Sequence, residues 1–339
     1  MEETYTLNHL QFLAEVEKIR KRSDKLFSNC MCPSCQGSPI YSHVFQKNGI
    51  LSEIATEGKV YMFKYHHLFS MQKGELPVSY ELDGINKCFG FYGFCNQHDT
   101  SVFADIENDP TIANWYEPRA QYLLAYRTMC REVYVNYQVY HIFDEILKTF
   151  TCADPNRQFL FMQEKANRMA TIGLMEKYKR LFEKGVFQED YSKYEFEVIT
   201  LPFQLDLCLA TPITIAEEMA PFYFGPPKED IDDVVNIVEI FPYKGKTLII
   251  MGFLNGKENK WMTEKYEQLC SDVHNISIAL QDILFRSEFH CMSGRLYEAI
   301  KEDIPLFLEE WILNRGQYSD HLNYRSNLFE KYIRKQLGF

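Results

Sequence analysis

Glycine and proline are scarce in this chain of 339 residues, with 16 and 13 copies. Apolar residues make up 46% of the chain and aromatic residues 15%. This composition excludes a low-complexity or largely disordered protein, because such chains are rich in glycine, proline and charge and poor in aromatics. We therefore expect a folded protein with a sizeable core and a length that suits two or three domains.

A long apolar run is also absent. The most apolar stretch, "KTLIIMGFL" (246–254), is far shorter than the roughly 20 residues that a membrane-spanning helix needs. The N-terminal "MEETYTLNHLQFL" is acidic and has no apolar segment of the signal-peptide type. We predict a cytoplasmic protein without a membrane partner.

Motifs of several common enzyme classes are missing. The chain contains no G-x-x-x-x-G-K-[ST], no G-x-G-x-x-G and no G-x-S-x-G, so nucleotide-binding loops and hydrolase elbows are not indicated. Positive charge is in deficit, with a formal net charge of −11. Any contact with nucleic acid would have to be local, because the surface as a whole repels phosphates.

Cysteine, in contrast, is abundant near the N-terminus. Five of the ten cysteines lie in the first hundred residues. In a cytoplasmic chain, cysteines are more often metal ligands or buried thiols than disulfides. The cluster therefore points to a metal site, and unmetallated thiols in a folded core are the alternative.

Two short pairs have the spacing that zinc requires. "CPSC" supplies Cys32 and Cys35, and "CNQH" supplies Cys95 and His98. Residues separated by two others can reach one ion from a single turn, and zinc takes four such ligands in a tetrahedron. We predict a structural zinc on these four residues, with Cys30 as an alternative ligand.

The order of these features resembles the HNH endonuclease family, whose ββα-metal motif is often supported by a treble-clef-type zinc site. The resemblance covers residues 28–107: a zinc pair, a strand that ends in His43, and a second zinc pair that opens a helix and is followed by Asp99. It implies that His43 is the general base, that Asp99 binds a catalytic Mg²⁺ or Mn²⁺, and that Asn48 orients the histidine. Ser42 stands where family members often carry a further ligand.

Other interpretations of these residues stay open. His43 could be a hydrogen-bonded core histidine or a further zinc ligand. An acidic residue such as Asp99 in the first turn of a helix is also stabilised by the helix dipole alone.

Hydrophobic periodicity predicts the remaining elements. Helices are expected over 8–27, from 99 onward, over 118–147, 157–183 and 257–284, and from 294 to the end. Strands are expected over 39–45, 59–66, 85–94, 193–209 and 235–254, the last as a hairpin. The fold class is α+β: a zinc-bound ββα module with an N-terminal helix (1–107), a long helical hairpin (108–190), and a small antiparallel sheet packed with C-terminal helices (191–339).

The sequence thus favours a zinc-stabilised, HNH-like nuclease that hydrolyses phosphodiester bonds in DNA or RNA. A stand-alone protein of this kind suits bacterial antiviral defence or a toxin, by fold-level analogy. The alternative is a non-catalytic zinc-binding module that contacts nucleic acid or protein. A protein partner or a homo-oligomer is compatible with either function.

Overall fold

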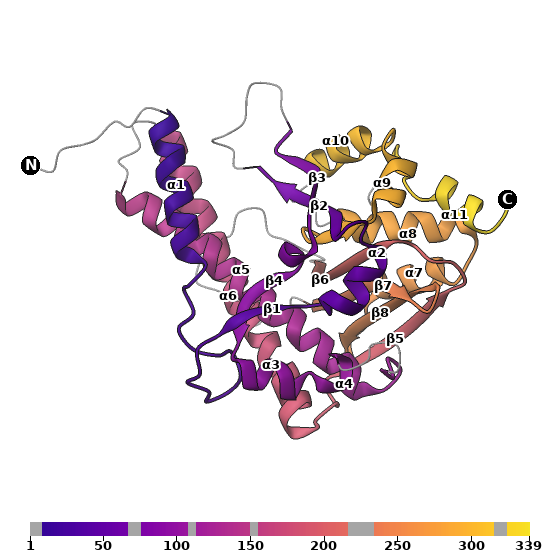
Figure 1. Cartoon of the computed structure of the whole chain (residues 1–339), viewed down its shortest axis with the longest axis horizontal. Helices are drawn as coiled ribbons and strands as arrows, with labels where there is room; N and C mark the ends of the chain where they lie inside the picture. The colour runs from indigo at the N-terminus through magenta and orange to yellow at the C-terminus, as the bar shows by residue number, and fades with distance from the viewer. Residues whose placement is uncertain (1–8, 67–75, 108–112, 150–154, 216–233, 315–323) are drawn as a thin grey trace, which may run out of the picture.

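The computed structural model describes residues 9–66, 76–107, 113–149, 155–215, 234–314 and 324–339. Helices and an antiparallel sheet are combined in one fold, which confirms the predicted α+β class (Figure 1). None of the helices in these ranges is long and apolar enough to span a membrane.

The N-terminal third alternates short elements. They are α1 (His9–Ser23), β1 (Ile40–His43), the π-helical η1 (Lys47–Leu51), α2 (Ser52–Ile54), β2 (Lys59–Tyr65), β3 (Val78–Gly84), the 3₁₀ turn η2 (Ile85–Lys87), β4 (Gly90–Phe94), α3 (Asn96–Val102) and α4 (Ala104–Glu107). Strands β1 and β4 form their own two-stranded antiparallel sheet, in which His43 is opposite Gly90. Helix α3 starts two residues after β4, so β1, β4 and α3 make a ββα unit.

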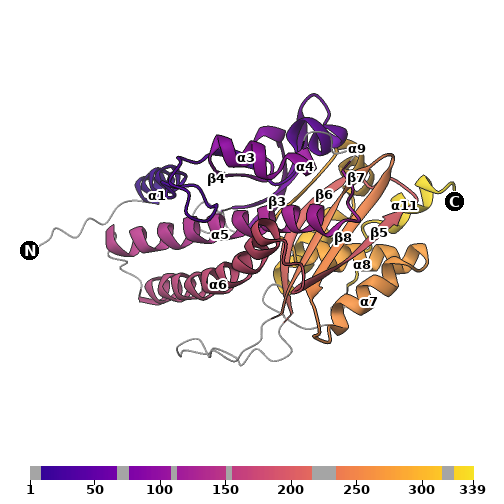
Figure 2. The same ribbon diagram turned by 90° about the horizontal axis from the view of Figure 1, so that it is seen from below.

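Two long helices form the middle of the chain. Helix α5 (Pro118–Thr149) begins at a proline, whose fixed φ suits the first helical turn, and α6 (Pro155–Gln188) begins at another. The two helices pack against each other and extend away from the sheet, with α1 beside α5 (Figure 2). The predicted helical hairpin is present, a few residues longer at each end of its second helix.

The C-terminal elements build most of a seven-stranded antiparallel sheet with the order β3-β2-β9-β6-β7-β8-β5. They are β5 (Tyr194–Leu201), β6 (Leu207–Ile215), β7 (Val234–Tyr243), β8 (Lys246–Leu254), α7 (Lys260–Leu269), α8 (Val273–Phe285), β9 (His290–Met292), α9 (Gly294–Ile300), α10 (Ile304–Asn314) and α11 (Glu330–Gln336). Strand β9 pairs with β2 on one side and with β6 on the other, so it connects the N-terminal strands β2 and β3 to the C-terminal strands of the sheet.

This sheet differs from the predicted one in size. Strands β2 and β3 come from segment 1–107, so the sheet takes strands from both sides of the predicted divisions at 107 and 190. The prediction missed β3 and β9, and it merged β5 with β6. Segments 1–107 and 191–339 therefore share a sheet.

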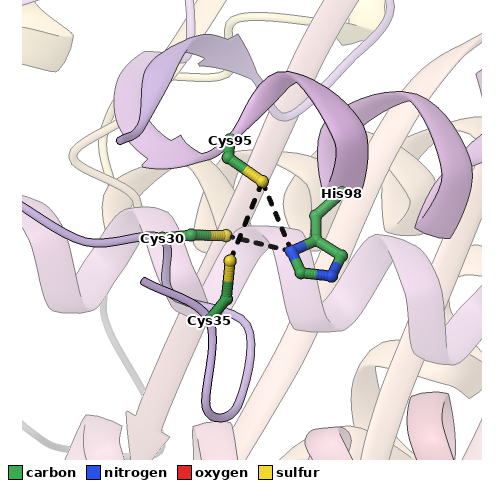
Figure 3. Close-up of side chains that lie close together, drawn as sticks. All are labelled: Cys30, Cys35, Cys95 and His98. Carbon is green, nitrogen blue, oxygen red and sulfur yellow. Dashed lines mark hydrogen bonds between the residues drawn. The ribbon is translucent and has the colours of Figure 1, made fainter. Parts of the chain in front are cut away.

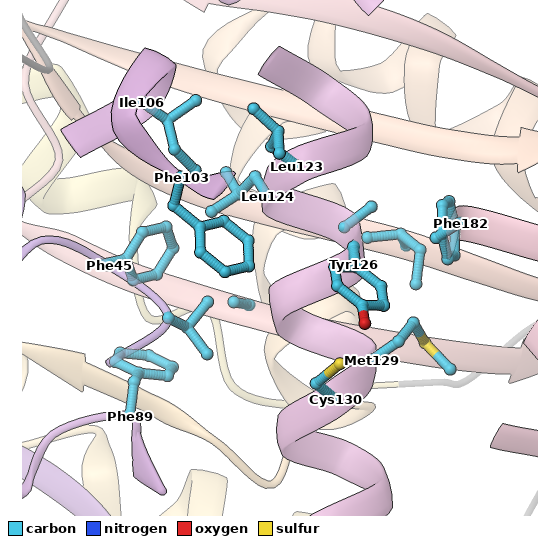
Figure 4. Close-up of a cluster of buried hydrophobic side chains, with 14 of the residues drawn as sticks. Phe45, Phe89, Phe103, Ile106, Leu123, Leu124, Tyr126, Met129, Cys130 and Phe182 are labelled. Carbon is cyan, nitrogen blue, oxygen red and sulfur yellow. The ribbon is translucent and has the colours of Figure 1, made fainter. Parts of the chain in front are cut away.

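Both faces of the central strands of the sheet are buried. On β7, Val235, Ile237 and Phe241 face α5, and Val238 and Ile240 face the C-terminal helices. The α5 face continues into the ββα unit, where Phe45, Phe103 and Tyr126 pack together (Figure 4). The ββα unit and the sheet thus both pack against helix α5.

Candidate metal centre

Four metal-ligand side chains meet between the N-terminal loop and the start of α3. The Sγ atoms of Cys30, Cys35 and Cys95 and a ring nitrogen of His98 all lie within 4.8 Å of one another (Figure 3). Three sulfurs and one imidazole are a ligand set typical of structural zinc. Within the described ranges, it is the one such group of three or more histidine, cysteine or acidic residues.

The separations between these atoms fit one tetrahedral ion. The Nδ1 atom of His98 lies 3.4 Å from Sγ of Cys30 and 3.4 Å from Sγ of Cys95, and Sγ of Cys35 lies 3.9 Å from Sγ of Cys95. Zinc bonds of about 2.3 Å to sulfur and about 2.05 Å to nitrogen place tetrahedral ligands about 3.8 Å apart for two sulfurs and about 3.5 Å for sulfur and nitrogen. These three separations match tetrahedral values and the remaining ones are at most 4.8 Å, so the cluster could hold a zinc ion after small side-chain shifts.

A tight loop brings the two N-terminal cysteines together. The Cys30 N–H donates to the Gly37 carbonyl at 2.8 Å, and the Gly37 N–H donates to Sγ of Cys35 at 3.3 Å. A Cβ atom at position 37 would lie 3.0 Å from Cβ of Cys95 and 3.3 Å from its sulfur. Glycine is needed there because the loop passes so close to the ligands.

Cys30, and not Cys32, joins Cys35 in the cluster, which corrects our first choice of ligand. The Cys32 side chain is 3% exposed and lies in the core near Cys130. Burial raises the pKa of the Cys32 thiol far above its usual range, so a thiolate there is disfavoured. The C-x-x-C spacing is therefore misleading here, because the loop between Cys30 and Gly37 decides which sulfurs converge.

The other two ligands come from the first turn of α3. Cys95 is the N-cap residue and His98 lies three residues further on. The backbone N–H of His98, at the N-terminus of α3, lowers the pKa of the Cys95 thiol, as expected at such a helix end. The spacing of this pair follows from helix geometry, and the sequence predicted both residues.

A tyrosine from α5 contacts the Cys30–Gly37 loop. The Tyr126 hydroxyl contacts the Met31 carbonyl oxygen at 3.2 Å and Oε1 of Glu183 at 3.3 Å. Tyr126 is fully buried and its ring lies near Phe94 and Phe103. The ligand loop is therefore fixed to the long helices as well as to α3.

His43, the predicted base, lies at the end of β1 and is partly exposed. Its Nε2 atom is 3.1 Å from the Asn86 carbonyl oxygen, and its ring makes an edge contact with Tyr41. Burial lowers the pKa of His43, helped by the charges of Lys47 and Arg127, while Asp99 and the Asn86 carbonyl act in the opposite direction. His43 is outside the four-residue cluster, so it is not a further zinc ligand there.

Asp99 is engaged by a buried arginine. Nη2 of Arg127 is 2.9 Å from Oδ1 of Asp99, and its Nη1 is 2.6 Å from Oε1 of Glu107. The Arg127 side chain is 1% exposed and its guanidinium stacks on Phe103 at 4.1 Å. Asp99 itself is 18% exposed. Its carboxylate is thus held in place by Arg127, while the side chain keeps some exposure.

Two further predicted positions have different surroundings. Asn48 is exposed in η1, and no hydrogen bond to His43 is found for it in the part of the chain that the structure describes. The backbone carbonyl of Asn86 holds the histidine instead. Ser42 is 1% exposed and adds no ligand beside His43, because neighbouring strand residues point to opposite faces.

Sequence reasoning did not find the roles of Arg127 and Asn86. The signal for Arg127 was a charged residue among the tyrosines on one side of a long helix, a pattern that is compatible with burial and indicates no partner. A backbone carbonyl leaves no signal in a sequence at all.

Comparisons with known proteins give no further guidance. No family model, no curated protein and no solved structure matches the chain.

Proposed function

We propose that this chain is a zinc-stabilised, metal-dependent nuclease of the HNH-like type, which hydrolyses phosphodiester bonds in DNA or RNA. The observation that supports it is the contact between Nε2 of His43 and the Asn86 carbonyl at 3.1 Å. A carbonyl oxygen can only accept a hydrogen bond, so Nε2 carries the ring proton. The lone pair is then on Nδ1, where it can accept a proton from water.

The protonation state of His43 suits a general base. Its pKa lies below the ordinary value of 6.5 because the ring is partly buried. The imidazole is therefore neutral at pH 7 and ready to take a proton. Protonation would remove this capacity, and because the pKa is lowered, cleavage should persist at pH 6.5 and decline only at more acidic pH.

Asp99 is the residue that would hold the catalytic ion. Arg127 binds Oδ1 and so fixes the orientation of the carboxylate, and the side chain keeps some exposure. The charge of Asp99 raises the pKa of His43, against the larger lowering effect of burial. A Mg²⁺ or Mn²⁺ ion at this carboxylate would neutralise the charge that develops on the phosphate during hydrolysis.

The zinc ligands have a separate, structural role in this proposal. Three cysteines and one histidine complete a tetrahedron and leave no position for water or substrate. They join the Cys30–Gly37 loop to α3 and thereby set the position of Asp99, one residue after His98.

A non-catalytic zinc module is the second candidate, and one observation favours it. Arg127 binds both Asp99 and Glu107. A buried arginine with two carboxylates is a common structural arrangement, and in that case Asp99 only secures α3 and α4 to α5.

The deciding experiment combines elemental analysis with plasmid and RNA cleavage in Mg²⁺ or Mn²⁺. It compares the wild type, His43→Ala, and His274→Ala as a control at an exposed histidine on α8. We expect one zinc per chain in all three proteins and cleavage reduced about 10²- to 10⁴-fold in His43→Ala alone. Zinc without cleavage by the wild type would favour the second candidate. Equal cleavage by wild type and His43→Ala would refute the proposed base.

A further inference from the structure

The first half of α6 has an apolar face that the described part of the chain leaves uncovered. Phe159, Met162 and Met169 are 55%, 56% and 63% exposed. Ala166, Ala170 and Gly173 are exposed between and after them. Single exposed apolar residues are ordinary, but a contiguous group of this kind marks an interaction site.

These residues form one stripe along the helix. Positions 159, 162, 166, 169 and 173 are spaced by alternating steps of three and four residues, the heptad pattern of helices that pack against other helices. Phe161 and Ile172 lie on the opposite side and are buried. Helix α6 thus has two apolar faces, of which only one is turned toward α5 (Figure 2).

The stripe carries no charge, although the chain has a net charge of −11. All exposed residues described from 158 to 173 are uncharged. Two of the three charged residues in this stretch turn toward α5: Lys165 pairs with Asp144 at 2.6 Å, and Arg168 donates to Asn136 at 3.1 Å. The third, Glu164, has a 46% exposed side chain, but helical periodicity places it on the side of α6 opposite the stripe, where it lies 3.9 Å from Arg168. Two acidic chains repel each other over most of their surfaces, so a neutral stripe is where two copies can meet at the lowest electrostatic cost.

Further along the same face the character changes to basic. Lys177, Arg180 and Lys184 are exposed there. A parallel pair of α6 helices would bring these charges of one copy against those of the other, which is destabilising. An antiparallel pair would place them at opposite ends.

We propose that the chain forms a homodimer through the stripe of α6, defined by Phe159, Met162, Ala166, Met169, Ala170 and Gly173, with the two helices antiparallel. Phe159 then faces Met169 of the second copy, and Met162 faces Ala166 of the second copy. Sulfur–aromatic contacts and large-against-small packing both favour this register. The dimer is independent of the proposed nuclease activity.

The size of the stripe indicates a dimer of moderate strength. Large side chains have accessible areas of roughly 150–250 Å², so the half-exposed Phe159, Met162 and Met169, with neighbouring small residues, offer about 400–500 Å² per copy. The total approaches the ~1,000 Å² that separates specific interfaces from chance contacts. We therefore expect dissociation in the micromolar range.

Analytical ultracentrifugation from about 1 to 100 µM tests the proposal. The wild type should shift from the monomer mass of 40.1 kDa to twice that mass as its concentration rises. Met169→Glu places a charge against Phe159 of the second copy and should raise the dimer Kd at least about 10-fold. The control is Leu160→Glu, the same change at a 57% exposed residue of the same helix outside the stripe, and it should leave the Kd within about threefold.

Orientation is tested with Met162→Glu, Ala166→Lys and the variant that carries both changes. Each single change should weaken the dimer, and the double variant should restore it, because residue 162 of each copy then faces an opposite charge at residue 166 of the other. In a parallel dimer the double variant would place like charges together and stay monomeric. A wild type that is monomeric at 100 µM would overturn the proposal, and so would binding to lipid vesicles through the stripe without self-association.

Discussion

The ββα module, here residues 28–45 and 85–107, and strands β6–β8 of the sheet use different means to stay folded. Strands β6–β8 bury apolar side chains on both faces, toward α5 and toward the C-terminal helices. The module is much smaller, and its aromatic residues, such as Phe91 and Phe94, pack onto α5 instead of onto a core of their own. A unit with so little core needs a further stabilising element, and the Cys₃His cluster can supply it.

Their buried charges differ as well. At the module, Arg127 of α5 is paired with two carboxylates of the module, those of Asp99 and Glu107. In the sheet, Glu239 is fully buried and receives one hydrogen bond, from Thr128 at 2.9 Å. A buried charge with two partners of opposite sign holds two elements in place, whereas a lone buried carboxyl becomes neutral and makes stability depend on pH. Three experiments test this comparison.

Replacement of a candidate metal ligand should have the largest effect on stability, and the loss of stability should be confined to the module. Cys35→Ser removes one of the four candidate ligands, and structural zinc contributes about 10–16 kcal/mol of binding free energy in small domains. We expect loss of bound zinc and fast amide exchange in β1, β4 and α3, with β6–β8 still protected. Hydrogen exchange and elemental analysis measure both effects.

The control is Cys270→Ser, at an exposed cysteine after α7. It should retain zinc and wild-type exchange. If Cys35→Ser also opened the sheet, the module and the sheet would be one cooperative unit and the comparison would fail.

Removal of the buried cation should have the next largest effect. Arg127→Met leaves Asp99 and Glu107 without their shared partner, and breaking a buried pair costs about 3–5 kcal/mol. Because both carboxylates keep some exposure, we expect the free energy of unfolding to fall by about 3 kcal/mol, the lower end of this range. Urea unfolding provides the measurement. Arg119→Met, at an arginine 38% exposed and paired with Asp105, is the matched control and should cost no more than about 1 kcal/mol.

Replacement of the lone buried carboxyl of the sheet, that of Glu239, should have the smallest effect on stability. The effect should appear as a change in how the free energy of unfolding depends on pH. Burial raises the pKa of Glu239 from 4.5 to about 8. Between these values the folded state holds a proton that the unfolded state has released, so stability falls as pH rises, by up to about 1.4 kcal/mol per pH unit. Glu239→Gln should flatten the slope of unfolding free energy between pH 5.5 and 7.5.

Glu132, whose pKa burial raises to about 7, contributes a slope of the same sign and should remain in that variant. Glu197→Gln, at an exposed carboxylate on β5, should leave the pH dependence unchanged. An unchanged slope in Glu239→Gln would mean that this carboxyl is ionised in the folded protein.

The predicted elements were most accurate where local pattern decides the structure. Helix α5 starts at Pro118 as expected, because a proline and a continuous helical pattern need no distant partner. Strand β9 could not be predicted: its three residues are a strand only because β2 and β6 lie on either side. The break between β5 and β6 was missed as well, because the alternating pattern of apolar residues runs on into the connection.

By itself, the sequence determined the kinds of ligand, the α+β class and the long helical hairpin, since each depends on residue type or on spacing within one element. It also placed Cys95 and His98 on one helical turn. Only the tertiary structure decided that Cys30 replaces Cys32, that Asn86 holds His43 and that Arg127 binds Asp99. These contacts join residues that are distant in the chain, and loop path and packing select them from partners that look equivalent in the sequence.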